Sequence, residues 1–480
     1  MLFGGPARTR VIVVLACVLA LASADAATVG ASAIELVHGL HINNADVGLL
    51  VAVSSLVGAV ASIPFGMLAD RVRRTWTLSF AVALWGVAML LSATARSFGG
   101  LLFWRLWLGV VTAAAGPAVA SLVGDYFPSG ERGKIYSYIL TGELVGAGAG
   151  FAITGDVAAL SWRAAFVILA LAAFPLAWLL FRLPEPVRGG AGVLTPAGRP
   201  GAATAGEGEL GEPGPGRHYK RSEDEEPQVT GRPQVTDAQR LAAERGIAPD
   251  YRLVRLAERK GIGLISAIRY VLAVKTNVSL IISSACGYYF LAGVATFGVE
   301  FVRNHYHVNA TLANLLMIVV GGGAAIGVMT AGPAADAWLR RGRLNARIIV
   351  AAIAATATVV LFIPALLSSS IVAALPYVIF AAGALSAQNP PIDAARLDIM
   401  PANLWGRAEG IRTFLRTMAQ ALAPLLFGLL SDQIGLQATF IVMLLPLAGS
   451  AFFLFRAMRT YPGDVATAAA ASGTPDATAA

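Results

Sequence analysis

The sequence has very little charge for its length. Of its 480 residues, 13% are Asp, Glu, Lys or Arg, whereas 56% are hydrophobic, and the mean hydropathy is +0.68. A soluble protein has about a quarter charged residues, so most of this surface is expected to face lipid. The net charge of +8 fits the basic loops of a membrane protein, and we expect no nucleic-acid partner.

Cysteine and histidine are also scarce. The two cysteines, Cys17 and Cys286, both lie inside apolar runs, and the five histidines show no ligand spacing. This pattern excludes a disulfide framework and predicts no metal site. The sequence contains neither a Gly-x-x-x-x-Gly-Lys-Ser/Thr phosphate loop nor a His-Glu-x-x-His motif, so we expect no cofactor, no ATP-driven step and no enzymatic activity.

Long apolar runs are abundant, and twelve of them can each cross a bilayer as a helix, because about 20 residues suffice. The predicted spans are residues 11–37, 46–68, 75–95, 99–122, 135–157, 162–182, 277–302, 311–335, 346–368, 371–391, 408–430 and 436–457. They predict an all-α membrane protein with two six-helix bundles, over residues 1–182 and 263–460. A cytoplasmic linker over 183–262 separates the bundles, and residues 461–480 are expected to form a disordered tail.

The N-terminus allows two interpretations. Arg8 and Arg10 precede a short apolar run, and Ala22-Ser23-Ala24 is typical of a signal-peptide cleavage site. However, the apolar run resumes after Asp25, and removal of this segment would leave an odd number of spans. A first membrane helix is therefore the favoured interpretation.

Arginine counting predicts the orientation. With the N-terminus inside, the outer loops hold only Arg96, Arg163 and Arg303, and the other loop arginines face inward. Both termini and the linker are therefore expected on the cytoplasmic side of the cell (inner) membrane. The Gly-, Pro- and acid-rich first part of the linker predicts disorder, whereas residues 236–260 predict short helices broken around residues 246–249.

One charged motif follows an apolar run in each half of the chain. Its glycine, aspartate and arginines are Gly66, Asp70, Arg71 and Arg74 in the first copy, and Gly332, Asp336, Arg340 and Arg341 in the second. A membrane protein built from two similar halves is most simply a secondary transporter that rocks one half against the other.

The first copy resembles the signature of the major facilitator superfamily, Gly-x-Leu-Ala/Gly-Asp-Arg followed by basic residues. The form of Asp70, Arg71 and Arg74 is similar to that of the spinster-like branch, as is an aspartate mid-way in the first helix, Asp25. The resemblance covers nearly all of the chain outside the linker and tail. It implies that the residues of both motif copies pair across an inner gate and hold an outward-open state.

The sequence departs from the spinster-like pattern in the fourth span. Spinster-like proteins tend to carry Gly-Glu-Ala there, seven residues after an arginine, but the residue seven positions after Arg105 is Thr112. An acidic group is therefore missing from the polar pathway. Glu143, in the fifth span, is the candidate substitute.

Charged residues inside the spans need an explanation, because each costs about 2.5–3.5 kcal/mol at the bilayer centre. We predict that Asp25 carries a proton and that Arg105 pairs with it or binds an anionic substrate group. Glu143, in a glycine-rich helix, is the third candidate of this proton-coupling group. A static ion pair or a position near the membrane boundary is the alternative for each of the three.

Several aromatic and polar residues are predicted to line a substrate cavity, with helix packing as the alternative. They are Trp104, Trp107, Thr112, Tyr288, Tyr289, Gln388 and Asn389. Glu35 and Glu300 are expected near the outer ends of their spans, and Asp393, Arg396 and Asp398 are expected to be gate or loop partners.

These features together predict a monomeric, proton-coupled secondary transporter. Its substrate is expected to be a small amphiphile or organic anion, which the spinster resemblance narrows to a lysolipid-like molecule. A drug or metabolite exporter of the same superfamily is one alternative. A non-transporting membrane sensor or scaffold, whose linker binds a cytosolic partner, is another.

Overall fold

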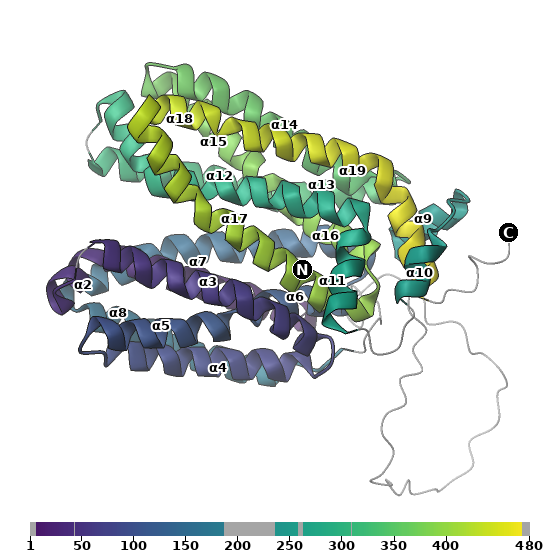
Figure 1. The fold of residues 1–480 in the computed structure, drawn as a ribbon, viewed down its shortest axis with the longest axis horizontal. Helices are drawn as coiled ribbons and strands as arrows, with labels where there is room; N and C mark the ends of the chain where they lie inside the picture. The colour runs from purple at the N-terminus through teal and green to yellow at the C-terminus, as the bar shows by residue number, and fades with distance from the viewer. Residues whose placement is uncertain (1–5, 43, 187–235, 258–262, 309, 473–480) are drawn as a thin grey trace, which may run out of the picture.

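The computed structural model describes residues 6–42, 44–186, 236–257, 263–308 and 310–472. Over these residues the chain is almost entirely helical and contains no strand. Figure 1 shows two helical bundles side by side, one coloured purple to blue and the other teal to yellow. We call them the N-half and the C-half. The result confirms the expected all-α architecture with two bundles.

The N-half consists of six long helical segments, which we call rods. Their helices are α1 (Pro6–Ala31), α2 (Ala33–Leu40), α3 (Asn44–Ala69), α4 (Arg74–Ala93), α5 (Phe98–Thr112), α6 (Ala115–Tyr126), α7 (Arg132–Leu160) and α8 (Trp162–Phe181), with a 3₁₀ turn η1 (Ser129–Glu131) before α7. Each of the pairs α1 with α2 and α5 with α6 forms one rod that is divided into two helices. The first predicted span divides at Ser32 into α1 and α2.

Six further rods build the C-half. Their helices are α12 (Lys275–Tyr306), α13 (Ala310–Arg340), α14 (Ala346–Leu367), α15 (Ile371–Ala387), α16 (Asn389–Ile399), α17 (Trp405–Ile434), α18 (Leu436–Val442) and α19 (Leu444–Ala471), with a turn η2 (Ala402–Leu404). Between the halves lie the short helices α9 (Asp237–Glu244), α10 (Tyr251–Ala257) and α11 (Leu264–Ala273). These three gather at one end of the molecule, on the right in Figure 1, which we call the insert end.

Proline divides the corresponding rod in each half. Pro117 follows the break between α5 and α6, and Pro390 and Pro391 follow the break between α15 and α16. Proline has no N–H and clashes with the preceding turn, so each rod restarts as a new helix. The matching breaks reflect the internal repeat.

The expectation for the C-terminal tail needs correction, and the one for the first part of the linker falls outside the described residues. The tail was expected to be disordered from residue 461, but α19 continues through Pro462 to Ala471. Its last turns are rich in alanine, the best helix former, and Val465 and Ala468 are buried. Residues 187–235, for which disorder is predicted, lie outside the described residues.

Ten helical segments of the described chain are long and apolar enough to span a membrane. The two remaining long helices are α7 and α13, which carry the glycine-rich sequences. In α7, Gly142 and Gly146 lie directly against Ala16 and Ala20 of α1, and a Cβ at Gly142 would lie 2.7 Å from the Ala16 oxygen. Small residues thus let these two backbones approach closely.

Candidate functional site

The two halves meet at the insert end through a carboxylate of α3 that caps a helix of the opposite half. Asp70, at the end of α3, accepts hydrogen bonds from the backbone N–H groups of Gly406 (2.8 Å) and Arg407 (3.1 Å) at the start of α17. The Arg407 Nε also lies 3.4 Å from the Asp70 Oδ2. The first N–H groups of a helix have no partner within it and attract negative charge, so Asp70 holds α17 against the N-half.

The second motif copy makes the reciprocal contact. Asp336, near the end of α13, accepts a hydrogen bond of 2.8 Å from the backbone N–H of Lys134 in the first turn of α7. Its other oxygen lies 2.9 Å from the Arg347 Nη2. Each half therefore presents an aspartate to a helix N-terminus of the other half.

Glycines allow the helices to approach closely beside both aspartates. A Cβ at Gly66 would lie 2.6 Å from the backbone oxygen of Gly406, and one at Gly332 would collide with the Gly133 carbonyl and the Ser137 hydroxyl. One turn deeper, the Ser62 hydroxyl donates a 2.9 Å hydrogen bond to the Gly410 oxygen. These contacts require glycine at Gly66 and Gly332.

The turn η1 of the N-half is held by arginines of the C-half. The Arg340 Nη1 donates a 2.8 Å hydrogen bond to the Gly130 oxygen, and Arg347 donates to the Ser129 oxygen. Nearby, the Arg132 guanidinium lies 5.1 Å from the centre of the Trp405 ring. We call this set of contacts between the halves, including those of Asp70 and Asp336, the insert-end gate.

Not all of the predicted gate residues lie in it. Arg71 and Arg341 are exposed. Arg74 is buried inside the N-half, where it pairs with Asp125 of α6 and lies 2.9 Å from a Glu185 oxygen. The expectation that Arg74 is a gate residue is therefore wrong, because its charge is already neutralised within one bundle.

Arg347 is the C-half counterpart of Arg74, and it is not among the predicted gate residues. It begins the same rod of its half and pairs with Asp398 of α16, as Arg74 pairs with Asp125 of α6. Unlike Arg74, it also pairs with Asp336, the gate aspartate. Aligning the two halves at Pro117 and Pro390 would have revealed this equivalence.

Glu185 fastens the segment after α8 to the start of α4, outside the membrane-spanning helices. Its carboxylate accepts hydrogen bonds from the Thr75 N–H (2.9 Å) and hydroxyl (2.7 Å), and from the Arg74 Nε (2.9 Å). Burial alone would raise the pKa of Glu185, but these hydrogen bonds and the Arg74 charge outweigh burial and lower that pKa below its ordinary value.

Within the N-half, the structure brings Asp25 of α1 and Arg105 of α5 together. The Arg105 Nη1 lies 2.7 Å from the Asp25 Oδ1, and the Arg105 Nη2 donates a 3.3 Å hydrogen bond to Ser54 of α3. Asp25 is 4% and Arg105 1% exposed. The pair thus joins three helices in the middle of the bundle.

A larger charge cluster lies in the C-half, where α16 meets α17. Arg396 pairs with Glu409, and Arg412 pairs with Asp393. Diagonal contacts join the two pairs, because Arg412 also lies 3.6 Å from Glu409. All four side chains are buried, so each charge is neutralised by a partner on the neighbouring or the same helix.

Sequence reasoning missed part of this cluster. Asp393 and Arg396 were expected to be gate or loop partners at the end of their span, but they face α17 instead. Glu409, Arg412 and Arg416 went unnoticed. Their spacing of three and four residues within an apolar span places them on one helix face, and this was the available signal.

Glu143 of α7 and Arg416 of α17 are two further charged residues within the long helices of the two halves. Each is half-buried. The Arg416 guanidinium lies 4.2 Å from the centre of the Tyr288 ring of α12. Among the described residues, neither Glu143 nor Arg416 forms a salt bridge, in contrast to the four charges beside them.

Two of the predicted cavity residues lie inside the C-half instead. Tyr289 packs in an aromatic cluster with Phe427, and its hydroxyl donates to the Met443 Sδ at 3.3 Å. Gln388, 1% exposed, donates to the Leu385 oxygen and accepts a hydrogen bond from Ser450. For these two residues the helix-packing alternative describes the structure better, because their polar groups have partners within the bundle.

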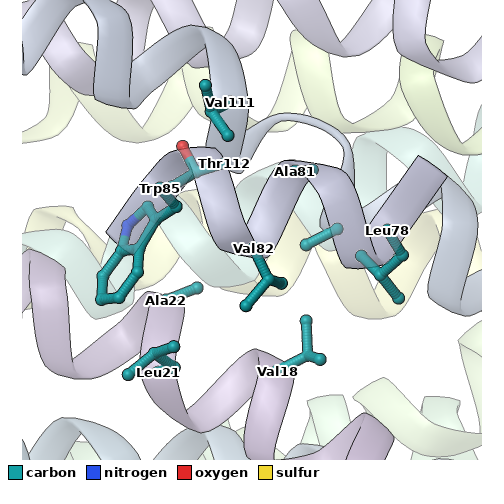
Figure 2. Close-up of a pocket in the computed structure, with 10 residues that line it drawn as sticks. Val18, Leu21, Ala22, Leu78, Ala81, Val82, Trp85, Val111 and Thr112 are labelled. Atoms are coloured by element: carbon teal, nitrogen blue, oxygen red, sulfur yellow. The ribbon is translucent and has the colours of Figure 1, made fainter. Parts of the chain in front are cut away.

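The other predicted cavity residues have varied surroundings. Thr112 lines a small apolar cavity of ≈ 20 Å³ between α1, α4 and the α5–α6 break, with Trp85 beside it (Figure 2). Its hydroxyl bonds to backbone oxygens of its own helix. Trp104 and Asn389 are half-buried, and Trp107 is 52% exposed. None of these four residues has a described contact with the opposite half.

Comparison with known proteins gives matches over most of the chain. The model of the Major Facilitator Superfamily matches residues 15–202 and 278–478. The model of the Organic Anion Transporter Polypeptide family matches residues 159–375.

Curated relatives match over shorter stretches. A gallate transporter of Pseudomonas putida is 30% identical over 185 residues, which is 38% of this chain and 41% of that protein. Protein spinster homolog 3 of Mus musculus is 31% identical over 156 residues, 32% of this chain and 30% of that protein. The chain thus spans about two fifths or less of the curated relatives it matches.

A solved structure extends the likeness to the whole fold. The proton:xylose symporter XylE, bound to 6-bromo-6-deoxy-D-glucose, has a TM-score of 0.65 at 14% sequence identity. The match covers 93% of this chain and 95% of that one. At this identity the likeness concerns the fold.

Proposed function

The chain belongs to the major facilitator superfamily, and we propose that it is a secondary active transporter that moves a small organic anion by alternating access. The superfamily consists of transporters and not of enzymes. Its fold of two six-helix halves enclosing a central site suits a rocking motion.

The insert-end gate is the observation that carries this proposal. Asp70 and Asp336 bind helix N-termini of the opposite half, and Gly66 and Gly332 let backbones touch. Such contacts can be broken and re-formed as a unit, since they gather at the insert end, where α3 packs against α17 and α7 packs against α13. They hold the molecule closed at the insert end, a conformation that we call the insert-closed state.

Two observations support a negative charge on the substrate. A gallate transporter and an organic-anion-transporter family model are among the matches. In the protein itself, Arg416 of α17 lies over the Tyr288 ring and has no salt bridge among the described residues. A lysolipid-like amphiphile, which the spinster resemblance implies, is the alternative substrate, and it also carries a charged group.

We propose that the proton gradient drives transport through Asp25. Protonation of Asp25 would remove the charge that binds Arg105 at 2.7 Å, and it would release the tie between α1 and α5. An ion pair buried inside a membrane protein is stable only while both partners stay charged. One proton can thereby change the packing of three helices.

The orientation completes the proposal. Arginine-rich loops lie at the insert end, where Arg71, Arg340 and Arg341 are found, so we assign this end to the cytoplasm. The insert-closed state is then the outward-facing state.

Counterflow in proteoliposomes tests the function. Vesicles loaded with unlabelled gallate should accumulate labelled gallate, and an inward-directed proton gradient should drive uptake. The Asp25→Asn variant should keep exchange but lose most of the gradient-driven uptake, whereas Asp432→Asn, at an exposed position of α17, should keep both. A wild type without exchange of gallate or of any other organic anion would support a scaffold instead of a transporter.

A further inference from the structure

The short helix α11 carries apolar side chains on two opposite faces. Ala267, Tyr270 and Val271 are buried on the face with which α11 packs against α12 and α17. On the other face, Ile265 is 69% and Leu272 is 45% exposed. A helix whose outer face meets water is expected to carry polar residues there, so this exposed apolar face indicates an apolar surrounding.

The position of α11 places this outer face at the boundary of the membrane. Val274 alone separates α11 from α12, and a candidate membrane span begins at Lys275, the first residue of α12. Figure 1 shows α11 at the insert end, running across the direction of the long helices. A helix that crosses the ends of the spanning helices follows the plane of the bilayer, where acyl chains meet headgroups.

The charges on α11 and on its neighbour α10 have one sign. Arg269 is exposed and lies on the same face of α11 as the two exposed apolar side chains, because they are spaced by three and four residues. Helix α10 packs against α11 and adds the exposed Arg252 and Arg255. The described helices α10 and α11 contain no acidic residue. Asp250, directly before α10, accepts a 2.9 Å hydrogen bond from the backbone N–H of Arg252.

We propose that α11, together with the arginines of α10, binds the headgroups of anionic phospholipids while Ile265 and Leu272 lie among the acyl chains. Arginine suits this place because its stem packs on apolar groups while its guanidinium reaches outward. Hydrogen bonds from a guanidinium to a phosphate are charge-assisted, and a basic surface attracts lipids with a net negative charge. The surface is distinct from the insert-end gate, and its lipid binding does not depend on which substrate is transported.

Fluorescence quenching tests whether α11 lies in lipid. A bimane label is attached at Ile265→Cys or Leu272→Cys in the full-length protein, with Cys17 and Cys286 replaced, in vesicles of equal parts phosphatidylcholine and phosphatidylglycerol. Lipids with a nitroxide close to the headgroup should quench either label strongly, and aqueous iodide should quench it weakly. Glu244→Cys, at an exposed position of α9, is the control, and iodide should quench a label there more strongly than the nitroxide lipid.

Brominated lipids test the charge of the headgroup. Bromine on the acyl chains quenches a neighbouring label, so the label at residue 265 reports which lipid lies beside α11. Brominated phosphatidylglycerol should be preferred over brominated phosphatidylcholine by about fivefold, the effect of about 1 kcal/mol for one basic side chain near an anionic surface. This preference should fall at high salt. The double variant Arg255→Gln, Arg269→Gln should lose most of it, whereas Arg240→Gln, at an exposed position of α9, should keep it.

The inference is overturned if iodide quenches the label at residue 265 as strongly as the label at residue 244, because α11 would then face water. Equal quenching by the two brominated lipids with all arginines in place would contradict selection of anionic headgroups. A full preference in the double variant, eluting as a single species in gel filtration, would contradict the role of the arginines. Exchange in proteoliposomes is measured separately, so these results leave the proposed transport function untouched.

Discussion

The aspartates of the two motif copies, Asp70 and Asp336, stabilise the insert-closed state. Asp70 accepts from two backbone N–H groups, and Asp336 from one, in the first turn of a helix from the opposite half. A hydrogen bond to a charged group contributes about 1.5–3 kcal/mol. Because these bonds cross between the halves, their free energy stabilises the insert-closed state and is lost when the gate opens.

Gly66 gives a prediction at the same scale. In Gly66→Ala, the new Cβ would lie 2.6 Å from the Gly406 oxygen, and overpacking of this kind typically costs 1–3 kcal/mol. The insert-closed state should become less populated. Labelling of a cysteine at the buried position Ser137, in a background without Cys17 and Cys286, should become faster.

The matched control is Gly148→Ala in α7, because nothing lies within 4 Å of a Cβ at that glycine. This variant should label like the parent protein. Equal labelling rates for Gly66→Ala and the parent would show that close approach at Gly66 does not maintain the gate.

Glu185 yields a prediction about acid stability. Its folded pKa is lowered, so its carboxylate contributes stability that is fully present above the unfolded pKa and is lost as the pH falls through the folded pKa. Glu185→Gln should therefore lower the thermal midpoint at about pH 7. The difference from wild type should shrink below the ordinary value of 4.5.

Unfolding curves in detergent at several pH values give this measurement. Glu300→Gln serves as the control, since Glu300 is exposed on α12. A gap between wild type and Glu185→Gln that is independent of pH would mean that the ion pair with Arg74 does not stabilise the N-half.

At the scale of elements, α9 bridges the two halves beside the gate. The N–H of Asp237 donates a 2.8 Å hydrogen bond to Ser129 of η1, in the N-half. The Gln239 side chain donates to the Asp398 oxygen of α16, in the C-half, and Ala238 and Ala242 are fully buried. The helix therefore contributes to the insert-closed state.

The N-cap of α9 is the place to test this contribution. The Thr236 hydroxyl accepts from the Gln239 N–H, and the Gln239 side chain accepts from the Thr236 N–H, which forms a capping box. Thr236→Ala should cost about 1 kcal/mol and increase amide hydrogen exchange in α9.

Ser370→Ala is the matched control, because Ser370 precedes α15 as N-cap but its side chain makes no capping bond. Exchange in α15 should stay unchanged in that variant. Unchanged exchange of α9 in Thr236→Ala would indicate that docking against η1 and α16, and not the cap, holds the helix.

At the scale of the whole molecule, the repeat made the architecture predictable. Apolar runs of spanning length predicted two bundles, and the duplicated Gly66–Asp70 and Gly332–Asp336 patterns predicted that the halves correspond. The apolar runs are a local signal that lipid imposes on a sequence, and the repeat can be read from the sequence directly. The continuation of α19 past Pro462 had one local signal, the helix-forming alanines at its end, but its packing against α9 and α10 could not be read from the sequence.

The site was less predictable for the same reason. Glu409, Arg412 and Arg416 lie in α17 at helical spacing, but the partners of Glu409 and Arg412, which are Arg396 and Asp393, come from α16. Tyr289 and Gln388 resembled cavity residues in the sequence and are buried within one bundle. Which polar residue faces the other half depends on helix rotation, and composition does not specify that rotation.

The central claim is that the molecule opens at the insert end when it closes at the opposite end. Distances between spin labels measure this motion most directly. One label pair joins the exposed positions Arg71 and Arg341 at the insert end, and the other joins the exposed positions Thr94 and Ser370 at the opposite end, with Cys17 and Cys286 replaced. Across pH and gallate concentration, we expect the first distance to lengthen as the second shortens. Two distances that stay constant under all conditions, or lengthen together, would contradict alternating access.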